Sequence, residues 1–479
     1  MDPYFQNQSC DPFTDSSVPC LLGNLPPYFV NVSSAQDVLA GITFAKEKNI
    51  RLVVQNTGHD LLGKSAGQGA LGLWEHPLKS TEIIQSYDSS SYRGPAMRIG
   101  AGVLAGEALA AAHKHGFRVV GGSAASVGLA GGYSQGGGHS LLSSAHGLGA
   151  DNVLEWEVVT PAGQHLTASP AENQDLYWAL CGGGGGTYGV VLSMTLILHP
   201  DGPVGGAHLA FQAADVGYDN YWKAINFFHA SLPAIVDSGG AILYQFDNES
   251  FTTISVAAPG QDEAQVAELL RPLIKGLKEL KMPHTFAPSF SSDFYTHFSA
   301  VLGPLPYGVF PVSYMSSSRL IPRSAVVDRP GDVSAALQTA VKSGSFTLGC
   351  LALNANRTQH PDNAVLPAWR EALLQVSTCY LAKARAAELT LSLTVHPPQS
   401  MGLDAPAVRD GGAPPRDDRG PDTGAGGRHA RVGHVSQRGR LPAAELAVRV
   451  LRGQLRASAR DQEEIRPRRT AVRCYGGGE

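Results

Sequence analysis

Residues 51 to 79 read RLVVQNTGHDLLGKSAGQGALGLWEHPLK, and this stretch predicts a strand that ends in a binding loop. The apolar run from Arg51 to Val54 is typical of a buried strand. The candidate binding residues that follow are Asn56, Thr57, Gly58, His59, Asp60, Gly63, Lys64 and Ser65. Because glycine has no side chain, backbone N–H groups in such a loop can approach an anion closely. The loop therefore predicts an anion site that His59 faces, with a plain turn and a solvated histidine as the alternative.

Two further glycine-rich segments follow. Residues 121–152 contain three glycine clusters, and residues 182–186 are five glycines between the strings DLYWAL and TYGVV. Ordering glycine costs more conformational entropy than ordering other residues, so this density favours backbone that lies flush against a flat or anionic group. A disordered linker is the alternative, but Val127 and Leu129 interleave too regularly for one. The candidate binding residues here are Ser123, Val127, Gly128, Gly131, Gly132, Tyr133, Gly136, Gly137, Gly138, His139, Gly186, Gly189 and Val190.

Together these motifs resemble the berberine-bridge-enzyme-like oxidoreductases of the vanillyl-alcohol-oxidase superfamily, which have a PCMH-type FAD-binding domain. The resemblance covers roughly residues 4 to 397, is strongest between 51 and 200, and extends to fungal secondary-metabolite members. It implies that the loop grips the FAD pyrophosphate and that His59 is bonded covalently to the flavin ring. Many members have a second link through a cysteine in a C-P-T-V-G-type segment. Ala124 stands at that position, so we expect FAD to be attached through His59 only.

The resemblance implies a reaction in which a small organic substrate (an alcohol, amine or C–H of a secondary metabolite) gives a hydride to flavin N5. Molecular oxygen is the expected acceptor, which makes an oxidase more probable than a dehydrogenase. The proton acceptor is not readable from a motif; Tyr133, His139 and Tyr314 are the candidates. A carbohydrate oxidase or a dehydrogenase of the same fold stays open, and so does a non-catalytic protein.

The fold class that the resemblance implies is α+β. We expect a two-subdomain PCMH-type FAD-binding domain over residues 24–201, and a substrate domain over 202–397 whose antiparallel sheet is covered by helices. Residues 1–23 form an N-terminal segment and 398–479 an aberrant tail. Apolar spacing predicts strands over 28–32, 51–54, 97–100, 154–160, 241–246 and 252–257, and helices over 38–48, 105–115, 175–180 and 262–280.

One further motif is a decoy. Gly100-Ala-Gly102-Val-Leu-Ala105 matches the G-x-G-x-x-G/A pattern of NAD-binding proteins. Such a site needs an acidic residue about twenty positions on, where this chain has the run from Val119 to Ser123. A NAD site is therefore disfavoured.

Composition excludes several classes. The 479 residues carry a net charge of −4, which gives no reason to expect nucleic acid or an anionic membrane surface as a partner. No apolar run is long enough for a membrane span, and the six cysteines lack metal-site spacing. We expect a monomer without a metal ion, whose partners are a small-molecule substrate and oxygen.

Two features favour the secretory pathway. Cys10 and Cys20 fit a small disulfide loop, and N-x-S/T sequons occur at Asn7, Asn31, Asn248 and Asn356. The chain begins MDPYFQNQSC, without the basic and apolar regions of a signal peptide. We expect a secreted or secretory-pathway protein whose signal peptide is missing from this version, in preference to a cytoplasmic or vesicular one.

The composition changes abruptly near Met401. Fifteen of the 26 arginines lie in the last 79 residues, and Tyr475 is the sole aromatic there. Read one nucleotide downstream, the codons for Arg460 to Arg473 allow AIKKKYDPDGLLYG, and those for Val450 to Leu455 allow F-Y-G-x-N-Y. Both strings resemble the family's C-terminal segment. We infer that the tail is translated out of frame, with a disordered basic tail as the alternative.

Overall fold

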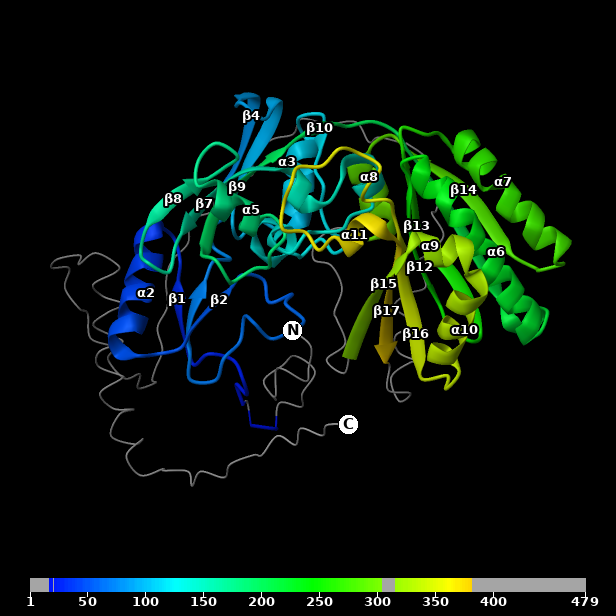
Figure 1. Ribbon diagram of the computed structural model, residues 1–479, viewed down its shortest axis with the longest axis horizontal. Coiled ribbons are helices and arrows are strands. Elements are labelled where there is room, and N and C mark those ends of the chain that lie inside the picture. The colour runs from blue at the N-terminus through cyan, green and yellow to red at the C-terminus, as the bar shows by residue number, and fades with distance from the viewer. Residues whose placement is uncertain (1–16, 20, 304–314, 381–479) are drawn as a thin grey trace, which may run out of the picture. The chain divides into compact units, whose positions relative to one another are not determined.

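The computed structural model describes residues 17–19, 21–303 and 315–380 (Figure 1). Three expectations lie outside the described residues: the pairing of Cys10 with Cys20, the role of Tyr314, and the out-of-frame origin of residues 398–479. All three stay predictions, and sequencing the transcript would test the last. Among the described residues, no helix combines the length and the apolar character that crossing a lipid bilayer requires.

A small parallel sheet begins the described fold. Its elements are β1 (Tyr28–Asn31), α2 (Ala35–Lys48), β2 (Leu52–Gln55) and β3 (Leu71–Trp74). The strand order is β1-β3-β2, with β3 parallel to both neighbours. The side chain of Ser34 caps the start of α2, and Asn49 ends the helix in a left-handed conformation with φ of 50°. This confirms the strand–helix–strand unit predicted over residues 28–54.

A five-stranded antiparallel sheet lies next in the chain. Its strands, in spatial order, are β4 (Thr81–Asp88), β5 (Arg93–Gly100), β9 (Val190–Ile197), β7 (Val153–Val159) and β8 (His165–Ala168). The accompanying short elements are α3 (Ala105–His113), β6 (Phe117–Arg118), η1 (Leu129–Tyr133), α4 (Ser143–His146), η2 (Gly149–Asn152), α5 (Gln174–Leu180) and β10 (His199–Pro200). Most of the glycine-rich segment 121–152 is buried, so it is packed structure and not a linker.

The glycines of the decoy motif have a packing role. A Cβ on Gly102 would collide with the carbonyl oxygen of His76, and one on Gly100 with that of Leu78. The chain between β3 and β4 thus runs directly against this turn. Glycine is needed there for close backbone approach, which accounts for the motif without a dinucleotide.

The second half of the described chain forms a seven-stranded antiparallel sheet. Its strands, in spatial order, are β14 (Thr285–Ser291), β11 (Val204–Gln212), β13 (Ser250–Pro259), β12 (Ala241–Phe246), β16 (Phe346–Ala352), β17 (Ala372–Tyr380) and β15 (Met315–Pro322). The helical elements here are η3 (Ala213–Asp215), α6 (Tyr218–Asp237), α7 (Glu263–Glu279), α8 (Phe294–Val301), α9 (Arg323–Asp328), α10 (Pro330–Val341) and α11 (Ala368–Glu371).

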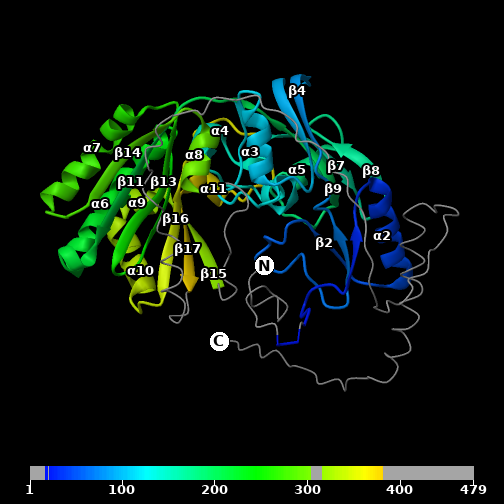
Figure 2. The same ribbon diagram turned by 180° about the vertical axis from the view of Figure 1, so that it is seen from behind.

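Both faces of the central strand β12 of this large sheet are packed against other parts of the chain. Along β12, Ile242 and Tyr244 pack into a core shared with α6, α7 and α10. Ala241 and Leu243 point the other way, into a core shared with α8 and the first half of the chain. Figure 1 shows α6, α7, α9 and α10 together on the outer side, and Figure 2 shows α8 beside α3, which it contacts. The α+β fold with a helix-covered antiparallel sheet is confirmed.

A segment between β16 and β17 fastens the two halves together. Arg370 donates from both terminal nitrogens to the Asp151 carboxylate, at 2.7 and 2.8 Å, and Asn363 donates to the same group at 2.8 Å. The backbone N–H of Asn354 donates to Ser144 Oγ at 2.9 Å. Arg370 and Asp151 are mostly buried, with side chains 13% and 3% exposed, so this junction is fixed by a desolvated ion pair.

Candidate functional site

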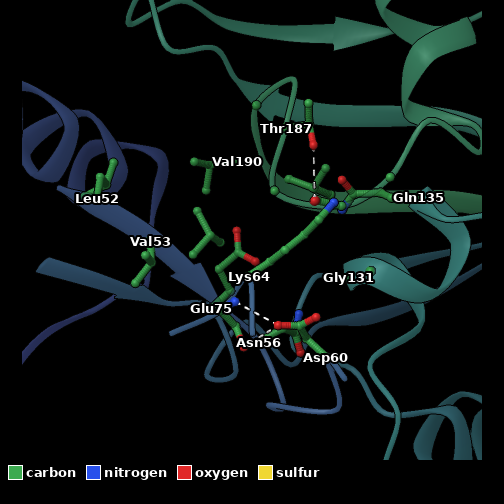
Figure 3. A pocket seen from close by; sticks show the side chains of 18 of the residues that line it. Leu52, Val53, Asn56, Asp60, Lys64, Glu75, Gly131, Gln135, Thr187 and Val190 are labelled. Carbon is green, nitrogen blue, oxygen red and sulfur yellow. Dashed lines mark hydrogen bonds between the residues drawn. The ribbon is translucent and has the colours of Figure 1, made fainter. Parts of the chain in front are cut away.

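A cavity of about 860 Å³ opens where the parallel sheet meets the glycine-rich segments (Figure 3). That volume is ample for a cofactor, since small-molecule sites are usually about 300–1,000 Å³. The sequence-predicted residues that line it are Asn56, Thr57, Gly58, His59, Asp60, Lys64, Ser65, Val127, Gly128, Gly131, Gly132, Tyr133, Gly136, Gly186, Gly189 and Val190. Three segments far apart in sequence therefore converge on one cavity.

Five predicted residues do not line the cavity: Gly63, Ser123, Gly137, Gly138 and His139. Gly63, Gly137 and Gly138 have φ of 74°, 111° and 77°. Their positive φ values shape the loops, because side-chain-bearing residues rarely adopt that conformation. The structure thus gives these glycines a backbone role beside the cavity, and whether a bound cofactor reaches them stays a prediction.

Asp60 fixes the loop after β2. Its carboxylate accepts hydrogen bonds from the backbone N–H groups of Leu62, at 3.0 Å, and Ser65, at 2.9 Å. Gly58, just before His59, has φ of 79°. The loop is therefore shaped by a glycine turn and an aspartate brace, which leave neighbouring side chains directed at the cavity.

His59 lies in the cavity wall, as its sequence context predicts. Its Nε2 is 2.8 Å from Ser126 Oγ, on the opposing glycine-rich segment. Burial lowers the pKa of His59 below its ordinary value, which favours the neutral imidazole. The contact with Ser126 Oγ restrains the orientation of this neutral ring in the cavity wall.

The glycines across the cavity allow the backbone segments of its walls to come close to one another. A Cβ on Gly128 would lie 2.5 Å from Asn56 Oδ1, and one on Gly185 would lie 2.9 Å from the Gly132 Cα. Real Cβ atoms essentially never come that close to another atom. These positions therefore need glycine for close packing between the β2 loop and the two glycine-rich segments.

Three buried acceptor oxygens in the cavity wall lack a hydrogen-bond partner among the described residues: Asn56 Oδ1, Glu75 Oε1 and Gln135 Oε1. Leaving such an atom unpaired costs about 1–3 kcal/mol, so a native protein usually pairs it with water or a ligand. FAD offers hydroxyl and N–H donors, and the glycine loops offer room and N–H groups for its pyrophosphate. The residues present fit that cofactor.

The sequence analysis missed Glu75 and Gln135. Glu75 directly follows β3, and its side chain is 3% exposed. Gln135 lies within the second glycine-rich segment and donates from Nε2 to the Ala130 carbonyl at 2.9 Å. The available signal for Glu75 was an acid at the end of an apolar strand, beside a predicted binding loop.

Two candidate proton acceptors lie beside each other. The Tyr133 hydroxyl donates to the His139 carbonyl at 2.8 Å, and burial raises the pKa of Tyr133 well above its usual range. The His139 ring stacks on Trp369 with centroids 5.8 Å apart, and burial lowers its pKa. Both side chains have structural contacts, and their assignment as bases stays a prediction.

Cys181 lies away from the cavity lining and is fully buried. Its Sγ accepts a hydrogen bond from Trp156 Nε1 at 3.3 Å, and burial raises the pKa of the thiol to about 12. A buried protonated thiol is a poor nucleophile. Cys181 is therefore a poor candidate for a second link to a flavin.

Comparison with known proteins identifies the family to which this chain belongs. Residues 26–169 match the FAD binding domain family. The VAO-type flavoprotein MtVAO615 from Myceliophthora thermophila C1 has a crystal structure that superposes with a TM-score of 0.76 at 46% identity, over 82% of this chain and 73% of that one. The chain belongs to the VAO-type FAD-linked oxidoreductases.

Two curated relatives of this family are similar over most of the chain. The flavoprotein oxidase VAO615 of Thermothelomyces thermophilus is 49% identical over 77% of this chain and 65% of its own length. The bifunctional decalin synthase calF of Penicillium decumbens is 46% identical over 79% and 66%. The chain thus spans about two thirds of the length of these relatives.

The family's fold extends to more distant proteins. The BBE-like 1 protein of Physcomitrella patens superposes with a TM-score of 0.60 at 19% identity, over 76% of this chain and 79% of that one. At that identity the likeness concerns the fold alone. It agrees with the resemblance to berberine-bridge-enzyme-like proteins seen in the sequence.

Proposed function

We propose that the chain is a covalent flavoprotein that oxidises a small secondary metabolite and passes the electrons to oxygen. The observation that carries this is the place of His59, in contact with Ser126 in the wall of a cavity whose buried acceptors have no partner among the described residues. The family supports FAD as the cofactor. The names of curated relatives, a flavoprotein oxidase and a decalin synthase, support an oxidase that acts on a metabolite.

FAD, when bound, supplies the redox chemistry by accepting a hydride from the substrate and giving electrons to oxygen. The chain supplies the positioning. The loop braced by Asp60 and the glycines around Gly185 would hold the pyrophosphate through backbone N–H groups. His59 would hold the isoalloxazine ring covalently, and Ser126 keeps the imidazole in the orientation that this bond needs.

The attachment is single in this proposal. Ala124 has no group that could bond the ring, and the Cys181 thiol is buried against Trp156 outside the cavity lining. A histidyl link withdraws electron density from the ring, which makes the flavin a stronger oxidant. His59→Ala should therefore weaken oxidation even where FAD still binds.

The test begins with the purified full chain precipitated in acid. We expect the yellow colour to stay in the wild-type pellet and to move to the supernatant for His59→Ala. Stopped-flow reoxidation in air then separates an oxidase from a dehydrogenase. A wild-type flavin that washes out in acid would refute the covalent link, and a chain without any flavin would refute the function.

We also propose that the protein passes through the secretory pathway. Two sequon asparagines, Asn31 and Asn356, are exposed, as glycosylation requires. Expression behind a secretion signal, followed by endoglycosidase treatment, should lower the apparent mass. No change in mass would argue against this route.

A further inference from the structure

Glu75 is a buried acid whose protonation state has no part in the function proposed above. It follows β3, the central strand of the parallel sheet, and its backbone N–H donates to the Gln55 carbonyl at 2.9 Å. This bond places Glu75 beside the start of the β2 loop. The side chain lines the cavity at 3% exposure, and Oε1 has no hydrogen-bond partner among the described residues. Within the same residues, no ion pair includes Glu75.

The protonation state of Glu75 follows from this burial. Desolvation raises its pKa to about 8, so the group is a neutral acid at neutral pH. A neutral carboxylic acid donates one hydrogen bond and accepts others, whereas a carboxylate only accepts. Above the pKa, a negative charge would appear in the cavity that we assign to an anionic cofactor. A neutral Glu75 adds no negative charge to this cavity.

The surroundings indicate which part of FAD Glu75 meets. Figure 3 shows its carboxyl group directed into the cavity, with Leu52, Val53 and Val190 on one side in that view and Asn56, Asp60 and Gly131 on the other. The flat adenine base of FAD can pack against the apolar side chains, and the backbone N–H groups of the loop at Asn56 can bind the pyrophosphate. The ribose joins base to pyrophosphate and carries hydroxyl groups, so it belongs between them.

We propose that Glu75, as the neutral acid, hydrogen-bonds the ribose in the adenosine half of FAD and makes FAD binding depend on pH. This inference rests on the proposed function. The other titratable and charged side chains that line the same cavity, among the described residues, are Lys46, His59, Asp60, Lys64 and Tyr133. A Glu75→Gln variant keeps all of them. A pH dependence that this variant removes is therefore due to Glu75.

The experiment uses the full-length His59→Ala chain, in which FAD can exchange. FAD and ADP are titrated calorimetrically from pH 6.5 to 9 into this parent and into its Glu75→Gln and Glu75→Ala derivatives. ADP carries the adenosine and pyrophosphate without the flavin. Glu82→Gln is the matched control, because that acid is exposed on β4 with a side chain 61% accessible.

We expect the parent's Kd for FAD to rise about tenfold between pH 7 and 9, as the neutral fraction of Glu75 falls. Glu75→Gln should bind like the parent at pH 7 with a flat profile, since an amide also donates and accepts. Glu75→Ala should raise the Kd for FAD and ADP alike, by roughly 5- to 100-fold. Glu82→Gln should follow the parent.

Three results would overturn the inference, and they are distinguishable. A Glu75→Gln profile that still rises assigns the pH dependence to another group. An Ala variant weakened for FAD but not for ADP places Glu75 away from the adenosine half. FAD and ADP binding by none of the chains, at any pH, overturns the inference, whereas the proposed function is refuted only by a wild-type chain without any flavin. If Glu75→Ala does not fold by circular dichroism, the pH profile of Glu75→Gln decides.

Discussion

The two halves of the described chain use buried space in opposite ways. Between residues 51 and 191, glycines bring backbone segments together around a cavity. Buried acceptors there, on Asn56, Glu75 and Gln135, lack partners within the described part of the chain. In the described residues between 204 and 380, aromatic side chains pack against one another in a core. Phe211, Phe228, Tyr244, Phe246 and Phe251 lie with ring centroids 4.5 to 6.4 Å apart.

The difference shows which half is prepared for a ligand. Close-packed aromatic cores are stable by themselves, because burial of apolar surface provides the free energy. A cavity lined by unpaired polar atoms is costly until something pairs them. We therefore expect core substitutions to act on stability in the second half and ligand binding to stabilise the first.

Among single substitutions, the largest effect should come from the aromatic core. Phe251→Ala should lower the free energy of unfolding by about 3–5 kcal/mol, because it leaves a cavity among packed rings. Urea denaturation of the purified protein measures this. The control Phe290→Ala, at a side chain that is 53% exposed, should change stability by about 0.5 kcal/mol or less. If the two variants lowered the free energy of unfolding equally, the aromatic core would not be the main source of stability in the second half.

The ion pair that joins the halves should come next. Arg370→Ala leaves the Asp151 carboxylate buried without its cationic partner and should lower the free energy of unfolding by about 3 kcal/mol. The exposed pair of Arg271 with Glu268 is the matched control, and Arg271→Ala should cost well under 1 kcal/mol. A small loss for Arg370→Ala would mean that the segment between β16 and β17 does not fasten the halves.

Acid should destabilise the first half through two stacked histidines. His146 and His199 lie 3.9 Å apart, and burial lowers their pKa values to about 4 and about 3. The unfolded chain binds their protons below pH 6.5 while the native state does not. Stability should therefore fall as the pH drops from 6.5 toward 4, by about 1.4 kcal/mol per pH unit for each histidine.

Denaturation at several pH values tests this, with His199→Gln as the variant. Glutamine can keep a hydrogen bond to Asn152, which now accepts one from His199 at 2.7 Å. The slope should become shallower but not vanish, because burial also lowers the pKa values of His229 and His297. An unchanged slope would exclude the pair as its source.

The smallest effect should come from the hydrogen bond between Ser126 and His59. Ser126→Ala removes the hydrogen bond that orients His59 and should slow covalent flavin attachment by roughly 2- to 10-fold. The time course of acid-stable flavin in apoprotein reconstituted with FAD measures it. Ser134→Ala, in the same glycine-rich segment, should attach flavin at the wild-type rate. Equal rates for both variants would leave Ser126 without a positioning role.

Local patterns predicted much of the fold. The helix predicted over 262–280 is α7, whose start is set by the reciprocal hydrogen bonds of Asp262 and Gln265 at 2.8 Å. The strand predicted over 241–246 is β12 to the residue. Capping residues and apolar periodicity are local signals, and these elements obey them.

The site could be predicted only in part. His59 and the glycine loops could be predicted because binding a cofactor requires dense glycine clusters and a histidine in a loop, and such patterns are rare in ordinary sequence. Glu75 could not be predicted, because what distinguishes it is a buried oxygen that no other described residue pairs in three dimensions. The Ser126 contact with His59 joins residues 67 positions apart and has no local signature.

The measurement that tests the central claim most directly is a tryptic map of the acid-denatured protein, with detection of flavin absorbance and peptide mass. Trypsin releases residues 52–64 as one peptide, which contains His59. The account predicts one flavin-bearing peptide, with this sequence, that disappears in His59→Ala. A flavin on any other peptide, or none on this one in a yellow protein, would contradict it.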